Sequence, residues 1–141
     1  MAMAYLLDAC VICEPVQRRP SAKVISFLNA LPAGSAYLSV LTLGEVRNGI
    51  ERLPESTRRR ELSRWFDSEL LGRFRGCILP IDESVALRWA SMRAVLEARG
   101  RVLPAIDSLV AATALVHGMK LVTRNEDDFD GTGVEIVNPW K

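Results

Sequence analysis

The chain lacks the features that would place it in a membrane or spread it over nucleic acid. Its apolar stretches are interrupted by polar residues before the roughly 18 that a membrane-spanning helix needs, and no charged-then-apolar leader opens the sequence. The formal net charge is only +1, which excludes a broad basic surface and permits a local basic patch. We therefore expect a cytoplasmic protein without membrane contact.

Internal repeats, low-complexity tracts and long linkers are also absent. The chain has 141 residues, of which 49% are hydrophobic, enough to build one packed core. We expect a single globular domain spanning residues 1–141.

Thiols and imidazoles are few. Cys10 and Cys13 form a C-x-x-C pair after the first predicted strand, a spacing found in redox and zinc sites. Zinc needs four ligands, and beyond this pair only Cys77 and His117 remain. The residues between the pair are apolar, and buried cysteines are common beside a core strand. A packing role is favoured, with thiol redox chemistry as the alternative.

Short apolar segments alternate with helical patterns. Strands are predicted at residues 4–7, 36–40, 77–81, 120–123 and 134–137. Helices are predicted from Ser21, from Thr42 until Pro54, over 56–74 and 84–99, and from about 104 or 107 to 118. Helices between short apolar strands indicate a parallel sheet covered on both faces. The predicted fold is α/β, a three-layer α/β/α sandwich with a central parallel sheet of about five strands.

Acidic and amide side chains stand where these elements meet. Asp8 ends the first strand, Glu45 lies near the start of the helix after the second, and Asp107 opens the last helix. Asn125 and Asp128 follow the fourth strand. Because ligands of an open parallel sheet gather at the carboxyl ends of its strands, we expect these groups to converge on one edge.

Each group also has a structural explanation. The spacing of Thr42 and Glu45 fits a capping box, in which the glutamate bonds to the helix start. Asp8 could be a turn residue, Asp107 could favour a helix dipole, and residues 125–128 could form a solvated loop. A single anionic pocket accounts for all of them together.

Such a pocket has a characteristic chemistry. Clustered carboxylates repel one another, so they must recruit cations or raise some pKa values. Hard oxygen ligands favour Mg²⁺ or Mn²⁺, which complete their coordination with water and phosphate oxygens. The implied reaction is phosphodiester hydrolysis, in which the metal activates water and stabilises charge on the phosphate.

The chain resembles the PIN-domain ribonucleases, specifically the VapC-type toxins of bacterial toxin–antitoxin pairs. The resemblance rests on residues 5–12, 38–50, 105–114, 121–129 and 137–140. The ending Asn138-Pro-Trp140 and the segment 77–83 are similar to the FitB-like branch.

This resemblance implies a Mg²⁺-dependent endoribonuclease in which Asp8, Glu45 and Asp107 hold the metal. It also implies a VapB-like antitoxin, a homodimer and a toxin–antitoxin hetero-oligomer, with operator DNA bound only through the antitoxin. The antitoxin's carboxyl-terminal segment would cross the toxin groove and place a basic side chain among the acids.

The chain departs from the family pattern at two positions. Ala9 stands where many members have a hydroxyl residue, and Asn125 stands where many have a fourth acid, for which Asp127 or Asp128 could substitute. Thr113 matches a hydroxyl position of the family, although it could simply bond to its own helix. These departures keep open an alternative function, a catalytically weakened PIN-like module that acts through antitoxin binding.

Arginines are the candidates for RNA contact. The basic residues of the third predicted helix and its end are Arg58, Arg59, Arg60, Arg64, Arg73 and Arg75. A basic helix face is often only solvated surface. Arg47, close to Glu45 in sequence, could instead touch the scissile phosphate or balance the acids.

Overall fold

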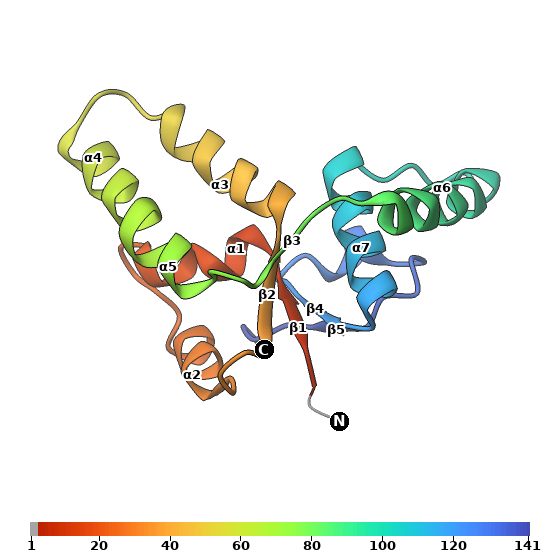
Figure 1. Cartoon of the computed structure of the whole chain (residues 1–141), viewed down its shortest axis with the longest axis horizontal. Coiled ribbons are helices and arrows are strands. Elements are labelled where there is room, and N and C mark those ends of the chain that lie inside the picture. Colours follow the sequence, from red (N-terminus) through yellow and green to blue (C-terminus); the bar gives the residue numbers. More distant parts are fainter. Residues whose placement is uncertain (1–2) are drawn as a thin grey trace.

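A computed structural model describes residues 3–141 as a sheet of five parallel strands flanked by helices (Figure 1). Residues 1 and 2, which the single-domain prediction includes, lie outside the described residues. The strand order is β3-β2-β1-β4-β5. The predicted α/β class with a central parallel sheet is confirmed.

All five predicted strands are present, and each is shorter than predicted. They are β1 (Tyr5–Leu7), β2 (Ala36–Ser39), β3 (Ile78–Leu79), β4 (Lys120–Val122) and β5 (Ile136–Val137). The end of β2 shows the reason, because the apolar pair Val40-Leu41 continues the strand pattern but already belongs to a helix. Apolar runs mark the buried segment, and backbone pairing decides where the strand stops.

The helices follow the predicted order with one addition near the start. They are α1 (Ala9–Ile12), α2 (Ala22–Ala30), α3 (Val40–Glu51), α4 (Thr57–Arg64), α5 (Leu71–Arg73), α6 (Glu83–Ala98) and α7 (Ala105–His117). A π-helical stretch, η2 (Trp65–Leu70), joins α4 to α5, and 3-10 turns form η1 (Glu14–Val16) and η3 (Glu126–Phe129). The short helix α1 and both 3-10 turns were not predicted. No helix within residues 3–141 has the length and apolarity to cross a membrane.

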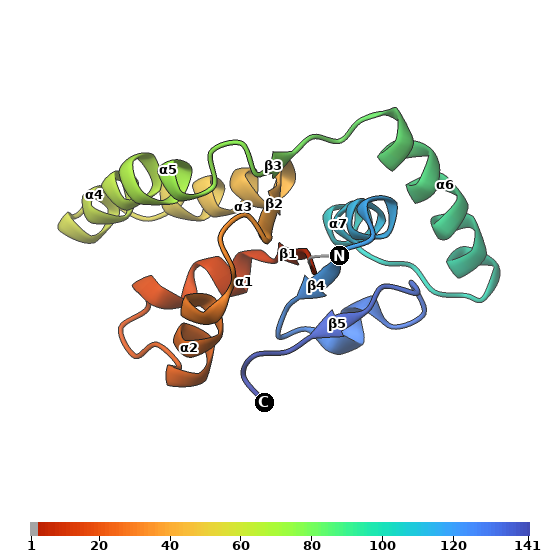
Figure 2. The same ribbon diagram turned by 60° about the horizontal axis from the view of Figure 1, so that its bottom comes forward.

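Alternation along the strands divides the core between the two faces of the sheet. Leu7 and Val122 pack with the helices of the first half of the chain, whereas Leu6 and Leu121 pack with α6 and α7. Neighbouring residues of a strand point to opposite faces, so each face receives one side chain of each pair. Figures 1 and 2 show α6 and α7 on one side of the sheet and α1 to α5 on the other.

The strand order places a topological switch point between β1 and β4. The chain begins in the middle of the sheet at β1, moves outward through β2 and β3, and returns to β4 on the other side of β1. Ligands of open parallel sheets bind outside the carboxyl ends of the strands at such a switch point. Asp8 and Thr123 follow β1 and β4 directly, so both stand at this switch point.

Candidate active site

Asp8 is a buried carboxylate held by two elements. Its side chain is only 7% exposed. One oxygen, Oδ1, accepts a hydrogen bond from the Ala9 N–H at 2.9 Å and caps α1. The other, Oδ2, accepts one from the Thr123 hydroxyl at 2.8 Å. A carboxylate can accept about four hydrogen bonds or ligands, so both oxygens keep lone pairs for a cation. The turn that could have explained Asp8 is a helix cap, and it fixes the carboxylate in place.

Thr123 is the functional neighbour that the sequence analysis missed. It is fully buried, and its Oγ1 also accepts the backbone N–H of Asn125 at 3.1 Å. The missing hydroxyl was sought at Ala9, beside Asp8 in sequence. The pairing of Leu7 with Val122 makes the next residues of the two strands, Asp8 and Thr123, neighbours in space. Parallel pairing of the first and fourth strands was the signal that could have found it.

Thr113 does not take that place. Its Oγ1 donates to the carbonyl of Leu109 at 2.8 Å, one turn earlier in α7. The interpretation of a buried helical threonine that bonds to its own backbone is therefore confirmed.

Glu45 lies within α3 rather than at its start. Ser39 is the N-cap, and its hydroxyl accepts the Leu41 N–H at 3.1 Å. The predicted start at Thr42 is wrong by three residues, because β2 passes into α3 without a loop. Thr42 and Glu45 consequently occupy helical positions, and the capping-box explanation for Glu45 fails.

Substitutions at Thr42 and Ser39 can test which residue caps α3. Thr42 is fully buried, and its Oγ1 has no hydrogen-bond partner within residues 3–141. A buried hydroxyl without a partner costs stability, so Thr42→Val should raise the free energy of unfolding by about 1 kcal/mol. Ser39→Ala should lower it by about 1 kcal/mol through loss of the cap. Urea unfolding measures both, and the opposite pair of signs would restore the cap to Thr42.

Asp107 lies in the first turn of α7, as predicted. The helix begins after Pro104, and its start is fixed against α6 by one side-chain contact. Trp89 Nε1 donates to the Ser108 hydroxyl at 2.8 Å, and that hydroxyl donates to the carbonyl of Ala105 at 2.7 Å. Ser108, the residue beside Asp107, is thus held by hydrogen bonds to α6 and to its own helix.

The acids influence one another electrostatically. Partial burial raises the pKa of Glu45, and the charges of Asp8 and Asp107 raise it further. Partial burial also raises the pKa of Asp107, with Asp8 and Asp128 adding to the effect. Mutual repulsion of this kind requires the carboxylates to be close together. Asp8 after β1, Glu45 in α3 and Asp107 in α7 therefore lie near enough to influence one another, and Asp128 in η3 influences Asp107.

Asp128 and Asp127 differ in which groups they influence. Asp128 acts on Asp107, whereas the charge of Asp127 acts on Lys141 near the carboxyl terminus. Asn125 begins η3, and its backbone N–H bonds to Thr123, beside Asp8. The amide is therefore anchored at the site through its main chain.

The donor set suits a hydrated hard cation. Within residues 3–141, no three Asp, Glu, His or Cys side chains are placed to hold a metal ion between them. The same residues contain no ion pair that involves Asp8, Glu45, Asp107 or Asp128. Mg²⁺ commonly binds through one or two carboxylates and retains several waters. Neighbouring carboxylates that form no ion pair suit such an ion.

Arg47 points away from the acids. Its guanidinium bonds to Glu51 at 2.9 Å and to Asp67 at 3.5 Å, and it lies 5.4 Å from the centre of the Phe66 ring. The prediction that Arg47 balances the acidic cluster is therefore wrong, because these partners lie at the end of α3 and in η2. Its contact with a scissile phosphate stays a prediction.

The cysteine pair has the properties of core residues. Cys10, Cys13 and Cys77 are all free thiols. Burial raises the pKa of Cys10, and burial together with Cys10 raises the pKa of Cys13 to about 11. Protonated thiols are poor nucleophiles and poor metal ligands. The packing interpretation is favoured over redox or zinc chemistry.

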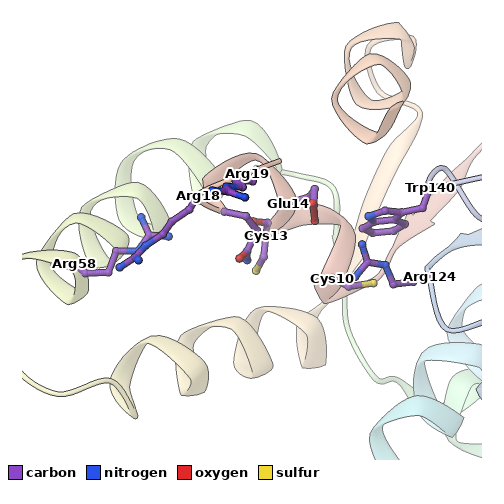
Figure 3. A pocket seen from close by; sticks show the side chains of 9 residues that line it. Cys10, Cys13, Glu14, Arg18, Arg19, Arg58, Arg124 and Trp140 are labelled. Carbon is purple, nitrogen blue, oxygen red and sulfur yellow. Dashed lines mark hydrogen bonds between the residues drawn. The ribbon is translucent and has the colours of Figure 1, made fainter. Parts of the chain in front are cut away.

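Two grooves adjoin the acids. A groove of about 830 Å³ is lined by Cys10, Cys13, Glu14, Gln17, Arg18, Arg19, Arg58, Arg124 and Trp140 (Figure 3). An apolar groove of about 340 Å³ runs between α1, α3 and α4 and includes Glu45, Val46, Ile50, Leu62 and Trp65. We call them the basic groove and the apolar groove. They meet at Cys10, Cys13, Gln17 and Arg58.

The family model for the PIN domain matches residues 5–134, which is nearly the whole chain. The chain belongs to the PIN-domain family. The resemblance inferred from its motifs is thereby confirmed. This PIN domain is 35% identical over 135 residues to Toxin FitB of Neisseria gonorrhoeae, with 96% of this chain and 97% of the relative covered. It is 32% identical to VapC ribonuclease Y4jK of Sinorhizobium fredii, covering 96% and 97% of the two chains.

Solved structures share the fold of this PIN domain over its full length. The structure of FitAB bound to an IR36 DNA fragment superimposes with a TM-score of 0.92 at 35% identity, covering 97% of this chain and 96% of the other. The two chains therefore share the same fold.

Proposed function

We propose that this PIN domain is the toxin of a type II, VapBC-like toxin–antitoxin system. It acts as a Mg²⁺-dependent endoribonuclease that hydrolyses RNA phosphodiester bonds, with residues 1–141 as one domain. The observation that carries the proposal is the buried Asp8 carboxylate, held at the switch point by Ala9 and Thr123, with Glu45 and Asp107 near enough for its charge to raise their pKa values. Relatives named as ribonucleases support the same activity.

Asp8, Glu45 and Asp107 would hold Mg²⁺ or Mn²⁺, one or two of them directly and the others through waters, with Asp128 and Asn125 at the edge of the site. A bound divalent metal supplies Lewis acidity to the phosphate and lowers the pKa of the attacking water. Asp8 is oriented for this role by its bonds to Ala9 and Thr123. Glu45 and Asp107 approach from α3 and α7, so the three carboxylates reach the site from independent, rigid elements.

RNA cleavage tests the proposal directly. The purified chain, free of antitoxin, should cut RNA in the presence of Mg²⁺ and not after chelation with EDTA, and its expression should stop growth. A chain that neither cuts RNA nor affects growth would leave the alternative of a weakened binding module. That alternative rested partly on the missing hydroxyl at Ala9, and Thr123 supplies a hydroxyl to Asp8 instead.

Thr123 gives a prediction about positioning. Thr123→Val removes the hydrogen bond to Asp8 and keeps the shape of the side chain. We expect a loss of about 10- to 100-fold in cleavage rate or metal affinity, the usual effect of losing a group that orients a ligand. Thr123→Ser should retain most of the activity. Mg²⁺ titrations of the rate would show a rise in the metal concentration needed, and equal loss in both variants would contradict this role.

The apolar groove suits the antitoxin. A VapB-like partner would place apolar side chains of its carboxyl-terminal segment against Val46, Ile50 and Trp65, and a basic side chain beside Glu45. The solved relative is a FitAB complex bound to DNA. We propose that this chain likewise forms a homodimer and a toxin–antitoxin hetero-oligomer, and that it meets operator DNA only through the antitoxin.

A further inference from the structure

The basic groove concentrates positive charge that the whole chain does not have. Four arginines line it, Arg18, Arg19, Arg58 and Arg124, against the single acid Glu14. The groove therefore carries a formal charge of +3, whereas the chain carries +1.

These arginines are not neutralised by carboxylates. Among residues 3–141, none of the four forms an ion pair, whereas the neighbouring Arg59 and Arg60 both pair with Glu55. Guanidinium groups without a carboxylate partner are available to phosphate oxygens, which they bind in a two-pronged geometry. The predicted basic helix is thus divided, with Arg58 directed to the groove and its neighbours directed to Glu55.

The segment that carries Arg18 and Arg19 is held in place by hydrogen bonds. Glu14 is 9% exposed, and its Oε1 accepts the N–H of Ser21 at 3.2 Å, which closes the loop between them. Arg58 donates to the carbonyl of Val16 from α4. The acid in the groove therefore supports the loop, and the arginines stand on a braced segment.

The other end of the groove carries a cation–π stack of Arg124 on Trp140. The guanidinium carbon of Arg124 lies 4.3 Å from the centre of the Trp140 ring. Asn138 holds the two segments together, because its Oδ1 accepts the N–H of Trp140 at 3.0 Å and its Nδ2 donates to the carbonyl of Arg124 at 3.5 Å. Figure 3 shows this stack at one end and Arg18, Arg19 and Arg58 toward the other, with Cys10 and Cys13 between them.

The stack adjoins the acidic site. Arg124 directly follows Thr123, whose hydroxyl bonds to Asp8. Cys10, which lines the groove, has its Sγ 3.7 Å from the same Thr123 oxygen. A chain lying in the groove would therefore run from the arginines past Cys10 to the carboxylates.

We propose that the basic groove binds a single-stranded segment of the RNA substrate next to the scissile bond. Arg18, Arg19 and Arg58 contact successive phosphates, and one base stacks on the exposed guanidinium plane of Arg124, backed by Trp140. Proteins that bind single strands combine a basic groove with stacking surfaces, and unpaired bases stack on arginine planes as well as on aromatic rings. An acidic peptide could bind the positive charge of the groove but would have no base to stack on Arg124. This inference rests on the proposed ribonuclease function.

RNA binding without cleavage tests the groove. In an Asp107→Asn background, the fluorescence anisotropy of a labelled single-stranded RNA of about 12 nucleotides gives the dissociation constant over a range of salt concentrations. The double change Arg18→Gln and Arg19→Gln should reduce the salt slope by about 1.4, because each lost phosphate contact removes about 0.7. Arg124→Gln should weaken binding by at least about fivefold. Arg124→Lys, which keeps the charge and loses the plane, should not restore it.

Arg88 provides the matched control. It is exposed on α6, on the opposite side of the sheet, so Arg88→Gln should bind RNA like the parent. Melting temperatures verify that each variant is folded.

Groove variants that bind RNA like Arg88→Gln, while the wild-type chain still cuts RNA, would overturn the proposal. It would also be overturned if those variants lost only antitoxin binding, or if Arg124→Lys regained full affinity. If the wild-type chain binds RNA through these arginines but does not cut it, the proposed RNA-binding role of the basic groove is supported and the proposed ribonuclease function is contradicted.

Discussion

Asp8→Asn and Asp107→Asn should each lower Mg²⁺-dependent RNA cleavage by at least about a hundredfold, because replacements of groups that merely orient metal ligands already cost about 10- to 100-fold. Each amide has nearly the shape of the acid and lacks its charge. Asn at position 8 can still cap α1 through its carbonyl oxygen, and the Thr123 hydroxyl can turn to accept from the amide. The loss should therefore reflect chemistry and not unfolding.

The cysteine pair is the matched control for this result. Cys10→Ser and Cys13→Ser change residues in the same grooves, and we expect both to cut RNA at close to the wild-type rate. Cleavage of a labelled RNA in excess Mg²⁺ measures all four variants under one condition. The reverse pattern, with the serine variants inactive and the asparagine variants active, would replace the metal hypothesis with thiol chemistry.

Mn²⁺ should stabilise the wild-type fold strongly. A ligand that binds only the native state at a hundredfold excess over its dissociation constant contributes about 2.7 kcal/mol, which corresponds to roughly 10 °C in melting temperature for a domain of this size. The acids are crowded without a cation among the described residues, so the bound metal also relieves their repulsion. Asp8→Asn and Asp107→Asn should remove most of this response.

In the metal-free protein, the charges of these acids lower the free energy of unfolding. The pKa values of Glu45 and Asp107 are raised in the folded protein by burial and by neighbouring acids, so their charged forms disfavour the fold. The free energy of unfolding should decrease as pH rises from their ordinary pKa values through the raised ones. Asp107→Asn should therefore stabilise the metal-free chain, by roughly 0.5 kcal/mol, the scale of partly exposed like-charge pairs.

Thermal melts in EDTA and in Mn²⁺ measure both effects on the same samples. The expected pattern is a variant more stable than wild type in EDTA and less stable in Mn²⁺. A wild-type response to Mn²⁺ that persists in Asp8→Asn and Asp107→Asn would place the metal elsewhere, and destabilisation by Asp107→Asn in EDTA would show that its charge is compensated.

Local sequence patterns determined the elements and the identity of the acids. Strand-like apolar runs, the Ser21 and Ser56 caps and the Gly118 stop mark their elements because each depends on residues close in sequence. The convergence of Asp8, Glu45 and Asp107 followed from one general rule, that parallel strands direct their carboxyl ends to the same edge. The PIN family itself was inferred from the resemblance of the sequence motifs around these acids.

The tertiary structure alone decided how those acids are held and what surrounds them. The bond between Thr123 and Asp8 joins residues 115 apart in the chain, and it depends on the pairing of β1 with β4. The ion pair of Arg47 with Asp67 and the contact of Arg124 with Trp140 likewise join segments that are apart in sequence. The N-cap of α3 at Ser39 could not be predicted from the sequence pattern, because Val40 and Leu41 suit a strand and a helix equally. Only backbone pairing distinguishes the two. Contacts between distant segments have no local period, so they exist only once the sheet has brought those segments together.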